Sequence, residues 1–101
     1  MFVIMYEFNV KKDRADRFTQ LWKKLTLLVD ELSDSLGARL HKASDTLWIG
    51  YAQWPTKDSW ENSNLNQKAI SELRAELFDV CDDIQIIYQL EVAVDLLATK
   101  H

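Results

Sequence analysis

The chain has few of the residues that interrupt or cross-link a fold, with one cysteine, one proline and two glycines among 101 residues. The lone Cys81 excludes an internal disulfide, which fits a reducing compartment. We interpret it as a packing residue of a helix rather than a nucleophile. With so few breaks, the sequence offers no linker. It therefore predicts one domain over residues 1–101, large enough to form a core without cross-links.

Long apolar runs and an excess of positive charge are also missing. No run approaches the roughly 20 apolar residues of a membrane span, and the first ten residues lack the features of a signal peptide. The net charge is −4, so binding to nucleic-acid phosphates lacks its main electrostatic contribution. We therefore predict a cytoplasmic protein that binds neither membranes nor nucleic acids.

What is present is an alternation of strand-like and helix-like periods. The expected bounds, in chain order, are a strand at 2–10, a helix from an Asp13 N-cap to about 33, strands at 36–42 and 47–54, a helical turn through 60, a helix through 81 and a strand at 84–92 that continues to 97. Two split βαβ units in this order predict a ferredoxin-like α+β fold, βαββαβ. Its four-stranded antiparallel sheet carries both helices on one face.

Strand parity then assigns side chains to the two faces of the sheet. If Lys42 pairs with Leu47 across the hairpin, Tyr6, Tyr51 and Tyr88 share the face beneath the helices. Three buried hydroxyls each need a partner, and two interpretations remain open: a pocket for a small aromatic ligand, or a packed core. The ligand-binding candidates are Tyr6, Trp22, Tyr51, Gln53, Trp60, Phe78 and Tyr88.

The opposite face has no helix left to cover it, although the same parity puts large apolar side chains there. Soluble monomers rarely expose such a patch. We therefore predict a two-fold homodimer with the sheets face to face. The interface candidates are Met5, Glu7, Arg39, His41, Trp48, Trp54, Ile87 and Glu91.

Residues 35–63, SLGARLHKASDTLWIGYAQWPTKDSWENS, resemble the antibiotic biosynthesis monooxygenase-like domain of the dimeric α/β-barrel superfamily. The first strand with Lys11-Lys12-Asp13 and the closing YQLEV are similar too. The resemblance implies a ferredoxin-like protomer in a back-to-back dimer. It also implies oxidation of a phenol or quinol by dioxygen, without metal or flavin. Other members of the family degrade haem or have no known activity.

The haem-degrading branch uses an asparagine in the first strand, a tryptophan in the short helix and a histidine in the next helix. The first two positions hold Tyr6 and Ser63 here, and the only histidines are His41 and His101. That branch is therefore disfavoured. For the phenol-oxidising branch, Trp60 loosely matches an aromatic residue of the short helix.

The residues identify neither a catalytic base nor a metal site, and they require no cofactor. A tyrosine, with a reference pKa of about 10, is a poor base at neutral pH, and parity places His41 away from the pocket. The leading hypothesis is a monooxygenase that acts on a small aromatic substrate. The alternative is a non-catalytic homodimer, ligand-binding or purely structural. A cavity beside the tyrosines would favour a ligand site, and a filled space would favour the structural role.

Overall fold

The computed structural model describes residues 1–63 and 65–97. Seven elements follow the predicted order, and their bounds lie close to the expected ones. They are β1 (Phe2–Val10), α1 (Ala15–Leu32), β2 (Gly37–Lys42), β3 (Leu47–Trp54), α2 (Lys57–Glu61), α3 (Lys68–Asp79) and β4 (Cys81–Glu91).

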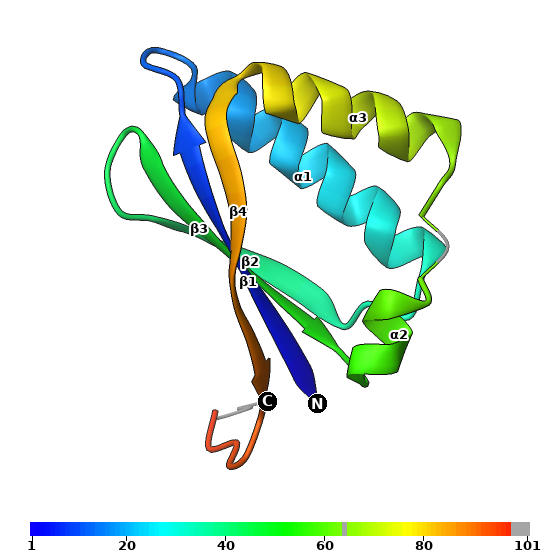
Figure 1. Cartoon of the computed structure of the whole chain (residues 1–101). Helices are drawn as coiled ribbons and strands as arrows, with labels where there is room; N and C mark the ends of the chain where they lie inside the picture. Colours follow the sequence, from blue (N-terminus) through cyan, green and yellow to red (C-terminus); the bar gives the residue numbers. More distant parts are fainter. Residues whose placement is uncertain (64, 98–101) are drawn as a thin grey trace.

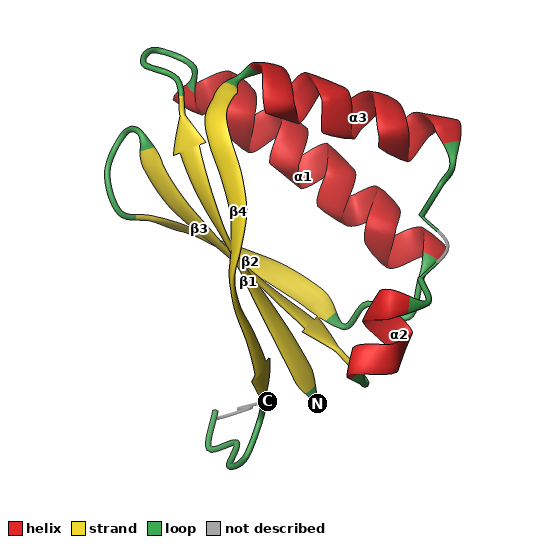
Figure 2. Ribbon diagram, in the orientation of Figure 1, coloured by secondary structure: helices red, strands yellow, loops and turns green. Residues whose placement is uncertain are grey.

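The strands form one antiparallel sheet in the order β2-β3-β1-β4, and both long helices lie on the same side of it (Figure 1). Figure 2 shows the resulting two layers, with the short α2 near the end of β3. This is the predicted ferredoxin-like arrangement, which is confirmed. No helix in the described part of the chain is long and apolar enough to cross a membrane.

The core lies between the sheet and the helices and is centred on Phe18 of α1, which is fully buried. Its ring centroid is 5.1 Å from that of Phe8 on β1 and 5.6 Å from that of Trp48 on β3. A second cluster contains Ile4, Trp54 and other apolar residues. Even-numbered residues of β1 therefore point inward, as predicted.

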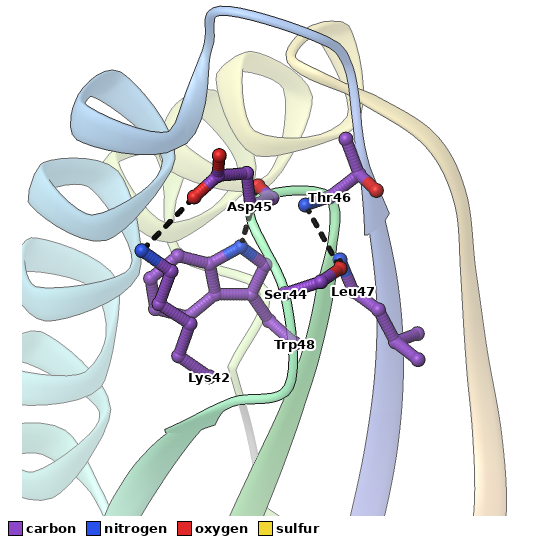
Figure 3. Close-up of polar contacts among 6 residues, drawn as sticks. All are labelled: Lys42, Ser44, Asp45, Thr46, Leu47 and Trp48. Carbon is purple, nitrogen blue, oxygen red and sulfur yellow. Dashed lines mark hydrogen bonds and ion pairs between the residues drawn. The ribbon is translucent and has the colours of Figure 1, made fainter.

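The predicted register of the β2–β3 hairpin is wrong by one residue, because Lys42 pairs with Trp48 rather than with Leu47. The turn accounts for the difference. The Ser44 hydroxyl oxygen accepts hydrogen bonds from the amides of Thr46 (3.3 Å) and Leu47 (3.0 Å), as Figure 3 shows for this turn. The Trp48 indole N–H donates to the Asp45 carbonyl oxygen at 3.1 Å, which holds the ring on the helix side.

A shift of one residue moves every side chain of a strand to the other face. Trp48 and Trp54 are consequently buried beneath the helices, with exposed fractions of 8% and 4%, and they are not interface residues of the open face. Tyr51 and Gln53 lie on the face without helices, where the Gln53 amide donates to the Tyr51 hydroxyl at 3.2 Å. Their predicted position in the tyrosine layer is therefore wrong.

Strand β4 also departs from simple alternation. Met5 pairs with Tyr88 and Tyr6 pairs with Ile86, so Ile87 is an extra, bulged residue. Beyond the bulge, Tyr88 lies on the face without helices, and Glu91, opposite Phe2, lies on the helix side. The predicted positions of Tyr88 beneath the helices and of Glu91 on the open face are therefore wrong. The open face keeps the four other interface candidates, which are Met5, Glu7, Arg39 and His41.

Three smaller expectations also need correction. Asp13 does not cap α1 but adopts a left-handed conformation (φ 66°), and Arg14 occupies the cap position without a side-chain hydrogen bond. Cys81 begins β4 and pairs with Val10, so it is buried in a strand rather than a helix. The last strand ends at Glu91, and residues 92–97 do not extend it.

Candidate functional site

A cavity of about 830 Å³ lies between the sheet and the helices. All four strands and all three helices contribute to its lining. Such a volume falls within the range of about 300–1,000 Å³ that is typical of small-molecule sites. Five predicted ligand-binding candidates line or border it: Tyr6, Trp22, Tyr51, Trp60 and Phe78.

Gly50 leaves the space into which two aromatic rings pack. A Cβ atom at this position would lie 2.9 Å from Cε2 of Phe8 and 3.6 Å from the indole nitrogen of Trp22. Gly50 pairs with Tyr6 on β1, so the indole N–H of Trp22 and the Tyr6 side chain lie above adjacent strands. A glycine inside a strand often marks such a close approach. A glycine inside a predicted strand was visible in the sequence, but we did not predict from it that Gly50 belongs to the site.

Tyr6 contributes a hydroxyl group to the cavity lining. Burial raises the pKa of this hydroxyl above its usual value of 10.0, while the Trp60 side chain and the Arg74 guanidinium act in the opposite direction. The raised pKa keeps the phenol protonated at neutral pH. Tyr6 is therefore a hydrogen-bond donor and not a base.

Trp60 is held over the sheet by the short helix α2. The helix begins after Thr56, whose hydroxyl oxygen accepts a hydrogen bond from the Ser59 amide at 3.0 Å. The ring centroid of Trp60 lies 5.6 Å from that of Phe2. Phe78 of α3 also lines the cavity, but it is 59% exposed. Trp60 therefore forms a wall, while Phe78 lies at the rim.

Charged residues of the cavity were missed by the sequence analysis. Lys57 and Glu61 form an exposed ion pair at 3.7 Å, while Arg74 of α3 and Asp30 of α1 also line the cavity. Asp30 lies eight residues after Trp22, on the same face of α1. The helical spacing between Trp22 and Asp30 was therefore the feature of the sequence that could have identified Asp30.

The other candidates are not brought together in the cavity. Tyr51 borders it, yet strand pairing directs its side chain to the opposite face of the sheet, as it does for Tyr88. His41, also on that face, is exposed and pairs with Ile49. His101 lies outside the described residues. Within residues 1–63 and 65–97, no three His, Cys, Asp or Glu side chains group as a metal site.

Comparison with known proteins finds no matching family model and no matching curated protein. Solved structures match over nearly the whole chain. SnoaB from Streptomyces nogalater, a cofactor-independent oxygenase, superposes with a TM-score of 0.80 at 12% identity, covering 96% of this chain and 97% of that one. The chain has the antibiotic biosynthesis monooxygenase-like fold.

Two further structures support the same fold. A proposed antibiotic biosynthesis monooxygenase from Bordetella bronchiseptica matches with a TM-score of 0.78 at 14% identity, over 92% of this chain and 97% of that one. Another, from Deinococcus radiodurans, matches with a TM-score of 0.76 at 11% identity, over 99% and 100% of the two chains. The predicted resemblance to this superfamily is thus confirmed for the fold.

Proposed function

We propose that this protein is a monooxygenase that oxidises a small aromatic substrate of the phenol or quinol type, without metal or flavin. The cavity carries this proposal, because Trp22, Trp60 and Phe78 line an open space instead of filling it. Aromatic walls suit a flat, apolar ligand. The fold shared with SnoaB, a cofactor-independent oxygenase, adds support.

In such a reaction the substrate itself supplies the electrons. For an anthrone, dioxygen places one atom on the methylene carbon, and the other leaves as water with the two hydrogens of that carbon. The protein then has to orient the substrate, exclude water and stabilise the developing oxyanion. Trp22 and Trp60 provide stacking surfaces, and the protonated Tyr6 hydroxyl provides a donor to the substrate oxygen.

Replacing Tyr6 by phenylalanine tests this role. We expect Tyr6→Phe to lower kcat for anthrone oxidation at least tenfold, because loss of one oxyanion donor typically costs about a hundredfold or more. Oxygen consumption measured with an electrode, with product followed by absorbance, gives the rate. Tyr88→Phe is the matched control and should leave the rate unchanged, since Tyr88 lies on the other face of the sheet.

The same assay separates catalysis from the alternative function. Wild-type protein that consumes no oxygen with anthrones, quinols and naphthols would contradict the monooxygenase. It would favour the non-catalytic dimer, and binding of the same compounds would then show whether the cavity is a ligand site.

We further propose that a second copy of the chain covers the open face of the sheet. No helix of the described residues lies on this face (Figure 1). Tyr88 and Leu90 are 57% and 42% exposed there, beside the half-buried Met5 and Ile49. A contiguous apolar strip of this kind supports association of two sheets.

A charge placed on this face tests the dimer. We expect the wild type to sediment as a dimer at micromolar concentration. The dissociation constant of the Tyr88→Glu dimer should be at least thirtyfold higher, because loss of an interface anchor costs about 2 kcal/mol. Leu27→Glu is the control, because Leu27 is equally exposed (60%) but lies on α1. A monomeric wild type would refute the dimer.

A further inference from the structure

One carboxylate oxygen of the half-buried Asp30 combines burial with the lack of a partner. Its Oδ1 atom is buried and makes no hydrogen bond to any residue among 1–63 and 65–97. Neither oxygen takes part in an ion pair within those ranges. Buried polar atoms are almost always hydrogen-bonded, and an exception at a cavity wall is a candidate for binding a ligand.

The needs of the helix do not explain an aspartate at this position. Asp30 lies in the last turn of α1, where a negative charge faces the negative end of the helix dipole. Aspartate is also a weak helix former. No hydrogen bond or ion pair within the described residues thus accounts for this carboxylate, whereas it offers a hydrogen-bond acceptor to a ligand in the cavity.

The end of α1 is held in place by a series of serine hydrogen bonds. The Ser33 hydroxyl donates to the Val29 carbonyl oxygen at 2.6 Å and accepts from the Ser35 amide at 3.2 Å. The Ser35 hydroxyl oxygen accepts from the Gly37 amide at 3.2 Å. These bonds fix the connection to β2 directly after Asp30, so the backbone that carries its side chain is held in place before any ligand enters.

The cavity follows one face of α1. Trp22, Thr26 and Asp30, each four residues from the next, all line it. At 1.5 Å per residue, Asp30 lies roughly 12 Å along the helix axis from Trp22. This separation corresponds to about the length of three linearly fused aromatic rings, with Trp22 near one end and the carboxylate near the other.

We propose that Asp30 determines substrate specificity by accepting a hydrogen bond from a hydroxyl group at the far end of a flat polycyclic phenol. The identity of this ligand rests on the proposed function. A carboxylate accepts hydrogen bonds and cannot donate them. It therefore selects ligands with an O–H at this end and discriminates against their methyl ethers, which have no proton to donate.

Binding of a matched pair of compounds tests this anchor. The probes are 2,6-dihydroxyanthraquinone and its dimethyl ether, and the readout is quenching of tryptophan fluorescence, because Trp22 and Trp60 line the cavity. We expect the wild type to prefer the dihydroxy compound at least tenfold, the size expected for a hydrogen bond to a charged group. Asp30→Ala should reduce this preference about tenfold, mainly through weaker binding of the dihydroxy compound.

Two further variants separate anchoring from folding. Asp34→Ala removes the same charge from an exposed position just beyond α1 and should keep the wild-type preference. Asp30→Ala should melt at or above the wild-type temperature, since it removes an unpartnered buried oxygen. If it melts lower, Asp30→Leu, which keeps a similar branched shape but has no hydrogen-bond acceptor, replaces it in the comparison.

The outcomes distinguish this proposal from the proposed function. Loss of the preference in the Asp30 variants supports the anchor, even if no oxygen is consumed. An unchanged preference overturns the anchor, even if oxygen uptake proves the enzyme active. Failure of both compounds to bind the wild type overturns the anchor too, while oxygen uptake with smaller phenols would still support the monooxygenase.

Discussion

Trp48→Glu is expected to unfold the protein rather than to change its oligomeric state. Trp48 is 8% exposed and packs 5.6 Å from Phe18, and its indole N–H donates to the Asp45 carbonyl. Removing a buried aromatic ring costs about 3–5 kcal/mol, and an unpaired buried carboxylate adds to that cost. We expect the free energy of unfolding to fall by at least about 4 kcal/mol, measured by chemical denaturation.

The matched control is the same substitution on the open face. Tyr88→Glu should remain folded, because Tyr88 is 57% exposed in the protomer. The register first expected from the sequence places Trp48 in the subunit interface, where the same substitution would dissociate or unfold the protein. A well-folded monomeric Trp48→Glu variant would therefore show that β3 faces the other way.

Gly50→Val is expected to narrow the cavity beside Trp22 and to destabilise the fold. Its Cβ would lie 2.9 Å from the Phe8 ring, closer than such atoms approach in real proteins, and its methyl groups would extend toward Trp22. Overpacking of this kind costs about 1–3 kcal/mol. We expect a lower melting temperature and at least tenfold weaker binding of aromatic ligands, measured by tryptophan fluorescence.

A second-site change identifies the clash as the cause. Phe8→Leu removes the ring atoms that the new Cβ would touch, so it should restore part of the stability lost in the smaller Gly50→Ala variant. A double-mutant cycle measures this coupling. Additive effects, or Gly50 variants that bind and melt like the wild type, would contradict the close packing.

The element order was predictable because the periods in this chain are unusually clean. The alternation in β1 and the helical spacing of α1 leave little choice, and few glycines or prolines disturb them. The register of β3 was not predictable in the same way. It depends on the Ser44 hydroxyl oxygen, which accepts hydrogen bonds from two backbone amides of the turn. The pattern of apolar residues does not reveal these hydrogen bonds.

The site was predictable only in part, for the same reason. Tyr6, Trp22 and Trp60 come from elements whose faces follow from simple spacing, and they line the cavity. Tyr51 and Tyr88 depend on a hairpin register and on a bulge, and both were assigned to the wrong face. Asp30 was overlooked because a single carboxylate on an amphipathic helix looks like an ordinary solvated residue.

The bulge at Ile87 gives the stretch of β4 from Asp83 to Glu91 one residue more than β1 can pair with there. Shortening the chain by this one residue would leave a regular ladder over that stretch, in which the neighbouring side chains keep their faces. The same shortening within β3, between Trp48 and Trp54, would turn one of these buried tryptophans toward the other face. Chains that share this architecture are therefore expected to vary in length beside Tyr6, in the edge strand, and to keep the length of β3 constant.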